Sequence, residues 1–261
     1  MLFKFAIGIE YSGTAYSGWQ QQKHCVSIQQ HLQEAIGFVA NHPVSLVCAG
    51  RTDAGVHAIE QIAHFESDAV RTNRSWLLGS NCRLPGDIRI KWISRVDESF
   101  HARFSACARS YRYILLNSDV PSAVFHNRCS WEFRALDHEK MHDSAQILVG
   151  EHDFSAFRAV GCQAKSACRN IQSVEVSRQG DLIYLDIVAN AFLYHMVRNI
   201  TGSLLEVGRG EKPADWIEEL LVGKDRNIGG VTAPAAGLYL QRVYYPETFK
   251  IPSYSKKPVL F

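Results

Sequence analysis

The sequence predicts an α+β fold built from two ferredoxin-like βαββαβ halves with mostly antiparallel sheets. Apolar residues alternate with period two in several short segments, which is typical of strands, and recur at helical spacing in others. These segments follow the order strand, helix, strand, strand, helix, strand twice, with one additional helix in the second copy. We expect helices on one face of each sheet and a central cleft between the halves.

The elements of the first half begin with a strand, because apolar residues alternate from Phe3 to Tyr11. A helix follows, whose apolar residues recur at helical spacing from Ile28 to Val39. Ser27 and Gln30 have the spacing of a capping box at its start. Further elements are expected at residues 43–49 (strand), 59–66 (strand), 73–82 (helix) and 88–96 (strand).

The second half repeats this order after the segment Asp97–Ala108, which is the best candidate boundary. Its elements are expected at residues 109–116 (strand), 137–149 (helix), 171–177 (strand), 182–188 (strand), 193–207 (helix), 215–222 (helix) and 238–244 (strand). The predicted division is therefore residues 1–104 for the N-terminal half, 105–245 for the C-terminal half and 246–261 for an irregular tail. We expect this tail to contact a partner subunit.

Composition excludes several classes of protein. The 261 residues are 46% hydrophobic and 21% charged, values typical of a globular chain. The formal net charge of +2 excludes a polybasic tail protein, and no apolar run exceeds four residues, whereas a membrane helix needs about 20. The N-terminal segment, residues 2–10, meets a charge too early and alternates too regularly for a secretory signal, and the seven cysteines are widely spaced. We therefore expect a cytoplasmic protein with reduced thiols.

One motif suggests a zinc site. His138, Glu139 and His142 satisfy the H-E-x-x-H pattern, which places two histidines on one helical face. The residues that follow lack the extension that would supply a third ligand. An amphipathic helix with Asp137 as its N-cap is therefore the favoured interpretation, and a zinc hydrolase is the less favoured one.

A second candidate site is the turn Ala49–His57, which joins two predicted strands and contains two glycines around Asp53. An ionised Asp acts as a nucleophile or a base, and the nearby Arg51 favours ionisation because a positive charge lowers a carboxyl pKa by about 1 to 3 units. The alternative is a solvated hairpin turn in which Asp53 bonds its own backbone. Local spacing leaves both interpretations open.

Positive charge is concentrated between Arg89 and Arg112, where six basic residues and two acids give a local net charge of +4. Aromatic residues are interleaved with the basic ones, a mixture that contacts phosphates and stacks on unpaired bases. Arg109 and Tyr111 share one strand face, and Arg103 lies upstream. RNA binding and a solvated basic edge beside core aromatics both explain this pattern. Arg198 falls outside the apolar stripe of its predicted helix and faces solvent or a cleft.

The segment 49–57, Ala-Gly-Arg-Thr-Asp-Ala-Gly-Val-His, resembles the active-site motif of the tRNA pseudouridine synthase A family. The resemblance covers nearly the whole chain. Its other motifs are Gly18–Gln20, His64–Phe65, Phe100–Phe104, Tyr111–Tyr113, Gly150–Phe154, His195–Asn199 and Ala233–Leu238.

This resemblance implies a homodimeric, cytoplasmic isomerase that modifies uridines at positions 38, 39 and 40 in the anticodon stem and loop of tRNA, without metal or cofactor. It implies that Asp53 is catalytic, that Arg51 and Arg198 flank it electrostatically, and that Tyr111 stacks on or deprotonates the target base. Arg103 and Arg109 are then expected to bind the RNA. The alternatives are a catalytically silent tRNA-binding protein and, less favoured, a zinc hydrolase that uses His138 and His142.

Overall fold

The computed structural model describes residues 2–252, which form two compact units. The first unit combines the chain up to Cys107 with the residues from Tyr239 onward, and the second unit runs from Ala108 to Leu238. The sequence division placed the segment 239–245 in the second half, so the structure differs there. In the structure, Tyr239 and Leu240 pair in parallel with His57 and Ala58 of the first unit. The part of the expected tail at 253–261 lies outside the described residues.

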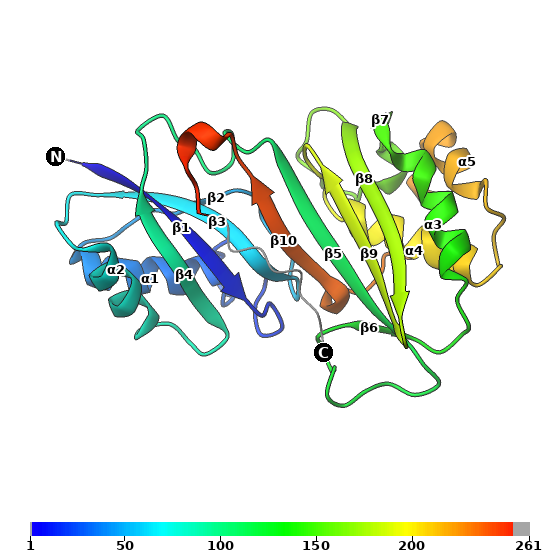
Figure 1. The fold of residues 1–261 in the computed structure, drawn as a ribbon, viewed down its shortest axis with the longest axis horizontal. Helices are drawn as coiled ribbons and strands as arrows, with labels where there is room; N and C mark the ends of the chain where they lie inside the picture. The colour runs from blue at the N-terminus through cyan, green and yellow to red at the C-terminus, as the bar shows by residue number, and fades with distance from the viewer. Residues whose placement is uncertain (1, 253–261) are drawn as a thin grey trace. The chain divides into compact units, whose positions relative to one another are not determined.

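The sheet of the first unit is built around β1 (Phe3–Tyr11), which pairs antiparallel with β3 (His57–Ser67) and β4 (Ile88–Arg95) (Figure 1). A short strand, β2 (Val47–Cys48), pairs antiparallel with β3. The last strand, β10 (Leu238–Tyr244), pairs in parallel with β3. The first unit therefore takes one strand from the far end of the chain.

Two helices cover this sheet on the same side, α1 (Ile28–Ala40) and α2 (Asn73–Asn81) (Figure 1). The expected cap of α1 is confirmed, because the Ser27 hydroxyl accepts the backbone N–H of Gln30 at 3.3 Å. The reciprocal half of the capping box is replaced by another bond, in which the Gln30 amide donates to Glu34 at 2.9 Å. The capping prediction is therefore half correct.

A buried aromatic cluster fixes α2 on the sheet. The rings of Phe5 on β1, Phe65 on β3 and Trp76 on α2 lie with centroids 5.3 to 5.5 Å apart. Each of these side chains is at most 5% exposed. Aromatic pairs of this geometry contribute about 0.5 to 1.5 kcal/mol beyond their buried area. The cluster is a main part of the first unit's core.

The second unit has an antiparallel ladder in the order β5 (Ala108–Asn117), β9 (Leu182–Ala189), β8 (Cys168–Gln179) and β7 (Gly150–Asp153). A three-residue strand, β6 (Ser130–Glu132), pairs in parallel with β5. Neither β6 nor β7 is predicted from the sequence pattern. Three or four residues are too few to show an alternating pattern.

The helices of the second unit are α3 (His138–Ala145), α4 (Met196–Gly208) and α5 (Trp216–Gly223), and α3 packs against β8 and α4. The helix expected at 137–149 ends at Ala145, because the chain continues as a 3₁₀ turn and then enters β7. Among residues 2–252, the structure has 3₁₀ turns at Gln146–Leu148, Ser155–Phe157, Arg226–Ile228, Ala235–Gly237 and Glu247–Phe249.

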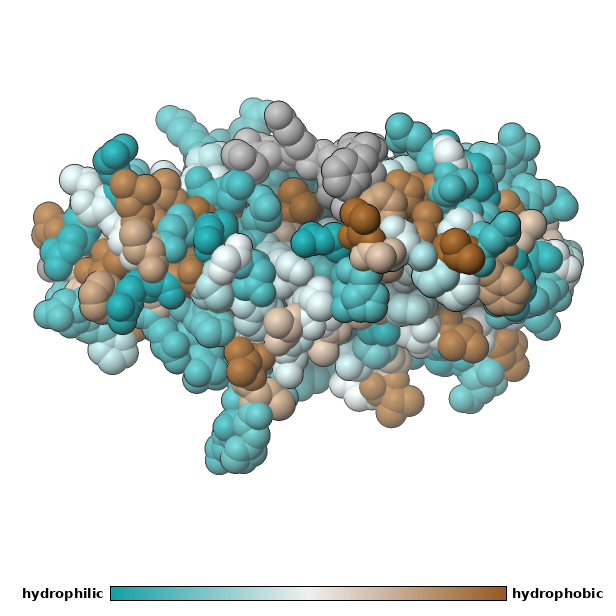
Figure 2. All heavy atoms as spheres, turned by 90° about the horizontal axis from the view of Figure 1, so that it is seen from below, coloured by the Kyte–Doolittle hydropathy of each residue, from teal (hydrophilic) through white to brown (hydrophobic). Residues whose placement is uncertain are grey.

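The predicted α+β class with mostly antiparallel strands is confirmed, since the described pairings are antiparallel except β3 with β10 and β5 with β6. On the face in Figure 2, apolar residues form several separate groups among polar ones. Within residues 2–252, no helix has the length and apolar character that crossing a membrane requires.

Candidate functional site

The Asp53 loop, residues 49–56, connects β2 to β3 and is hydrogen-bonded to β3. The backbone N–H of Ala49 donates to the Ile62 carbonyl at 2.7 Å. The N–H of Val56 donates to the Asp53 carbonyl at 3.1 Å, which closes a turn whose third residue, Gly55, has φ +78°. Such a turn favours glycine because a side chain is disfavoured at positive φ. The loop is therefore a defined turn that leaves Asp53 half-buried.

A second loop, which we call the Gly13–Trp19 loop, clamps the Asp53 loop through the backbone. The N–H of Trp19 donates to the Thr52 carbonyl at 3.0 Å, and the N–H of Gly55 donates to the Tyr16 carbonyl at 3.4 Å. Gly18 lies so close that a Cβ there would be 2.7 Å from the Thr52 carbonyl oxygen. Its φ of +89° also disfavours any other residue. The position of Asp53 thus depends on a glycine in a distant part of the sequence.

Side chains complete this clamp. The hydroxyl groups of Tyr11 and Thr52 are hydrogen-bonded at 2.7 Å in a buried environment. The Gly13 backbone N–H donates to Nδ1 of His57, whose ring stacks on Tyr239 with centroids 4.6 Å apart. Sequence reasoning did not assign supporting roles to Tyr11, Gly13 and Tyr239, because their contacts join segments that are distant in sequence. His57 is 2% exposed and serves the packing of the loop.

Two of the predicted arginines lie near the same buried thiol. Burial raises the pKa of Cys48 to about 12, while Arg51 and, more weakly, Arg103 favour the thiolate and lower that pKa. Both arginines are exposed residues of the first unit. The structure therefore brings Arg51 and Arg103 into one positively charged region beside the Asp53 loop.

In the second unit, Arg109 and Tyr111 occupy alternate positions of β5, as predicted. The Arg109 guanidinium donates to the Asn190 carbonyl at 2.8 Å. The Tyr111 ring meets Phe192 edge to face, with centroids 4.9 Å apart and an interplanar angle of 80°. The segment that follows β9 therefore holds two of the three predicted substrate-binding side chains, Arg109 and Tyr111.

Arg198 lies in the first turn of α4, where its Nε donates to the Ala233 carbonyl at 2.7 Å. In return, the Ala233 backbone N–H donates to the Arg198 carbonyl at 3.1 Å. The helix begins at Met196 rather than at Leu193, because His195 has a left-handed backbone with φ +60°. Arg198 is half-buried, and its pairing with Asp53 stays a prediction.

The aromatic residues of the basic segment divide into two groups. Phe100 and Tyr113 are at most 1% exposed and belong to the core, whereas Phe104 is 76% exposed. Arg112 is also buried and forms a bidentate ion pair with Asp186 at 2.7 and 2.6 Å. The segment therefore combines core residues with a smaller set that is accessible to a partner.

Comparison with known proteins identifies the family. Residues 7–105 and 144–246, well over half of the chain, match the family model described as tRNA pseudouridine synthase. The chain belongs to the tRNA pseudouridine synthase family. The predicted family is thus confirmed, and with it the enzyme class, an isomerase that acts on uridines of tRNA.

Individual relatives agree with this assignment. The tRNA pseudouridine synthase A of Hydrogenovibrio crunogenus is 59% identical over 247 residues, which cover 95% of this chain and 94% of the relative. The tRNA pseudouridine synthase A of Pseudoalteromonas atlantica is 52% identical over 256 residues, which cover 98% of this chain and 97% of the relative. A solved archaeal box H/ACA sRNP Nop10–Cbf5 complex has a TM-score of 0.33 at 11% identity, over 90% of this chain and 47% of that chain, which is too low to support an inference.

The residues matched to the tRNA pseudouridine synthase family include four of the predicted site residues. Arg51, Asp53, Arg103 and Arg198 lie within the matched segments. Tyr111 and its strand neighbour Arg109 lie between them, in the unmatched interval 106–143. Their roles therefore depend more heavily on the geometry of β5 and the turn after β9.

The zinc interpretation finds no support in the geometry. Nδ1 of His142 accepts the backbone N–H of Val176 at 3.2 Å, and the Asp137 carboxylate caps α3 by accepting the N–H of Lys140 at 3.0 Å. In the described part of the chain, no three His, Cys, Asp or Glu side chains are grouped so as to hold a metal ion. The favoured interpretation of H-E-x-x-H as part of a capped amphipathic helix agrees with these contacts.

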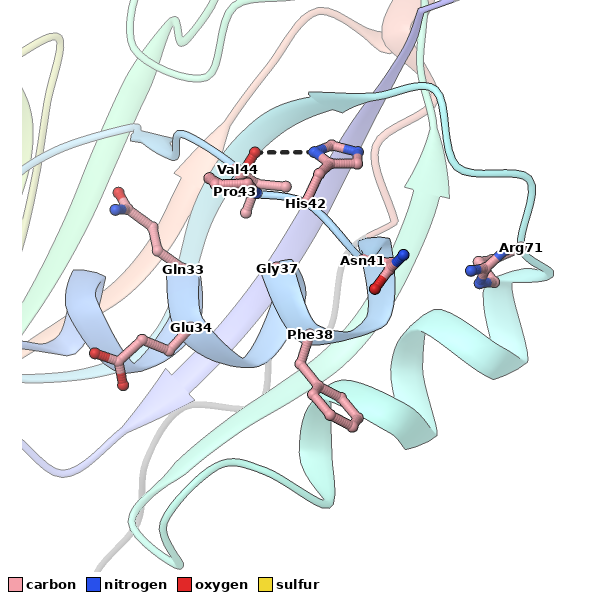
Figure 3. A pocket seen from close by; sticks show the side chains of 9 residues that line it. All are labelled: Gln33, Glu34, Gly37, Phe38, Asn41, His42, Pro43, Val44 and Arg71. Atoms are coloured by element: carbon pink, nitrogen blue, oxygen red, sulfur yellow. Dashed lines mark hydrogen bonds between the residues drawn. The ribbon is translucent and has the colours of Figure 1, made fainter.

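A broad surface cavity of about 670 Å³ lies elsewhere in the first unit, beside α1 and the turn that follows it (Figure 3). Phe38 and Glu34 line it from the helix, and Nδ1 of His42 is hydrogen-bonded to the Pro43 carbonyl at 2.9 Å. None of the predicted site residues lines this cavity. It is therefore separate from the candidate site.

Proposed function

We propose that this chain isomerises uridines at positions 38, 39 and 40 in the anticodon stem and loop of tRNA, with an ionised Asp53 as the essential residue. Family membership supports the reaction class. The observation that carries the role of Asp53 is the construction of its loop, in which two backbone hydrogen bonds from the Gly13–Trp19 loop fix the turn around a half-buried carboxylate. Fixed geometry of this kind is what catalysis by a positioned group requires.

The reaction needs such a group at the ribose. Forming pseudouridine breaks the bond between N1 of uracil and C1′ of ribose, rotates the base and joins C5 to C1′, without a change in composition or redox state. An ionised carboxylate starts this sequence by attacking C1′ or by removing a sugar proton. In either route Asp53 acts in its charged form. Arg51 and Arg198 are proposed to favour that form by their positive charge.

Tyr111 is proposed to contact the target base. The base must leave the helical stack before its ribose becomes accessible, which costs a few kcal/mol. The edge-to-face contact with Phe192 holds the Tyr111 ring in one orientation, which suits it to stack on the extruded base. The phenol is also the group that would remove a proton from C5 after the new bond forms.

Arg103 and Arg109 are proposed to bind the phosphate backbone. Contacts to phosphates provide affinity that does not depend on sequence and that falls as salt rises. Replacing either arginine by Ala is expected to weaken tRNA binding and to reduce the salt dependence of that binding by about one unit of slope. We further propose that the enzyme is a cytoplasmic homodimer, which sedimentation at several protein concentrations would test.

Mapping of modified positions tests the proposed function. Unmodified transcribed tRNA is incubated with the enzyme, and pseudouridine is then located by carbodiimide treatment and primer extension. We expect stops that report positions 38, 39 and 40, and no such stops with Asp53→Asn. Modification only outside the anticodon arm would overturn the proposed specificity. Binding of tRNA without any modification would support the catalytically silent alternative.

A further inference from the structure

The turn His101–Ser105 is held by four hydrogen bonds within five residues. The His101 carbonyl accepts the backbone N–H of Ser105 at 2.9 Å, and the His101 N–H donates to the Ser105 hydroxyl at 3.0 Å. The Nδ1 atom of His101 accepts the N–H groups of both Arg103 and Phe104 at 3.2 Å. The side chain of His101 thus organises the turn that carries Arg103 and Phe104.

Two further bonds attach this turn to the body of the first unit. The backbone N–H of Ala102 donates to Nδ1 of His64 on β3 at 3.1 Å. The Tyr245 hydroxyl donates to the Ala102 carbonyl at 2.6 Å. Ala102 itself is fully buried. The turn is therefore a fixed element in which the N–H and the carbonyl of one buried residue, Ala102, are both hydrogen-bonded to the rest of the first unit.

This fixed turn nevertheless presents a large aromatic side chain to solvent. Phe104 is 76% exposed, and its ring stacks on His101 with centroids 4.3 Å apart and an interplanar angle of 28°. The Arg103 guanidinium lies over the same ring at 5.6 Å from its centroid. Because the Phe104 ring is mostly exposed, it adds little to the stability of the fold through burial of apolar surface. Folding stability therefore does not account for a Phe at this position. Aromatic residues, Phe included, are enriched where proteins contact partners.

The charge around this ring favours RNA as the partner. Arg103 and Arg51 both act on the buried Cys48 thiol, so the turn and the Asp53 loop share one positively charged region. Unpaired bases stack on aromatic side chains, and neighbouring basic residues contact the phosphates. Stacking of this kind tolerates any base, because every base has a π-face. That tolerance suits an enzyme that acts at several neighbouring positions.

We propose that Phe104, supported by His101, stacks on an unpaired base of the tRNA next to the uridine that is isomerised, while Arg103 contacts the adjoining phosphate. This inference rests on the proposed function and adds a subsite to it. The stacking side chain binds the substrate and takes no part in the chemical step. Its loss therefore weakens binding and leaves turnover of fully bound tRNA nearly unchanged.

The test compares Phe104→Ala, Phe104→Leu and Phe104→Trp by their Kd for tRNA at one salt concentration. We expect Kd to rise about 5- to 150-fold for the Ala and Leu variants, and to stay near the wild-type value for the Trp variant. Phe38→Ala is the matched control, because Phe38 is 63% exposed and lies beneath Arg83, whose guanidinium is 4.2 Å from its ring centroid. This control is expected to bind like wild type.

A fluorescent probe reports the stacking itself. An anticodon stem-loop with 2-aminopurine beside the target uridine should be quenched by wild type and by Phe104→Trp, and much less by Phe104→Leu at saturating protein. Equal quenching and equal Kd for Phe104→Leu and wild type would overturn the inference. If that occurs while wild type forms pseudouridine, only the stacking subsite fails. If wild type forms no pseudouridine, the proposed function fails whatever the Phe104 variants do.

Discussion

The two units position their candidate functional residues in different ways. In the first unit, Asp53 lies on a loop whose place is set by backbone bonds from the Gly13–Trp19 loop and by the close approach of Gly18. In the second unit, Tyr111 lies within a regular strand and Arg198 within the first turn of a helix. The residues of the first unit therefore depend on backbone fit, whereas those of the second depend on side-chain packing around regular elements.

The largest effect on stability is expected at the ion pair that joins two strands of the second unit. Arg112 on β5 is directly opposite Asp186 on β9, and their side chains are 7% and 13% exposed. Arg112→Met removes the bidentate cationic partner of a carboxylate in a poorly solvated place, so the free energy of unfolding should fall by about 3 to 5 kcal/mol. Urea denaturation measures this loss.

Arg109→Met serves as the control for that prediction, because Arg109 is on the same strand but points to the opposite face and is more exposed. Its free energy of unfolding should fall by less than about 1 kcal/mol. The double variant Arg112→Met with Asp186→Leu should recover much of the lost stability. Equal losses for Arg109→Met and Arg112→Met would contradict the role given to the buried pair.

In contrast to Arg112→Met, which should lower stability, Gly18→Ala should mainly reduce turnover. A Cβ at this position meets the Thr52 carbonyl oxygen and displaces the Asp53 loop. A misplacement of about 1 Å costs on the order of 100-fold in rate. Gly210→Ala is the matched control, since Gly210 also has positive φ (+72°) but would place its Cβ in open space.

Both glycine variants should lose about 1 to 2 kcal/mol of stability from backbone strain, and Gly18→Ala somewhat more from the clash. Only Gly18→Ala should lose turnover, measured as the single-turnover rate at saturating tRNA. Unchanged turnover in Gly18→Ala would show that the backbone clamp does not position the carboxylate.

A smaller effect on stability, which depends on pH, is expected at His64. Its Nδ1 accepts the backbone N–H of Ala102 in the turn His101–Ser105. The pKa of His64 is lowered to about 4, chiefly by burial and also by the nearby His101 and Lys4, while Glu66 opposes them. In the unfolded chain the pKa of His is about 6.5. Since the folded pKa is depressed, this contribution to stability is present above pH 6.5 and is lost as pH falls toward 4.

The free energy of unfolding should therefore fall by up to about 2 kcal/mol between pH 7 and pH 5 through this group. His64→Gln keeps an acceptor for the Ala102 N–H but binds no proton, so its stability should depend less on pH over the same range. Urea denaturation of both proteins at the two pH values measures the difference. The same pH dependence in both proteins would assign the effect to other groups.

The sequence predicted most long strands well, because a half-buried strand carries its pattern in its own residues. The strand expected at 182–188 is β9 at Leu182–Ala189, and the one expected at 43–49 is reduced to Val47–Cys48. The strand expected at 238–244 is present as β10, but it pairs with β3. Alternation identifies a strand and contains no information about its partner.

The candidate site shows the same limit. Arg109 and Tyr111 could be assigned to one strand face from spacing alone, and the structure agrees. The support given to Asp53 by Gly18 could not be predicted, because it arises from contacts between loops that are distant in sequence. Spacing also could not distinguish Phe100 from Phe104, although Phe100 is buried in the core and Phe104 is exposed.

The most direct test of the central claim is tritium release from tRNA labelled at C5 of uridine, which follows formation of the new C5–C1′ bond. Wild type and Asp53→Asn are compared in a single turnover at protein concentrations that saturate the tRNA, with Asp68→Asn, an exposed aspartate at the end of β3, as the matched control. We predict release by wild type and Asp68→Asn and none by Asp53→Asn, with nearly equal tRNA affinity in all three. Release by Asp53→Asn at the wild-type rate would contradict the account.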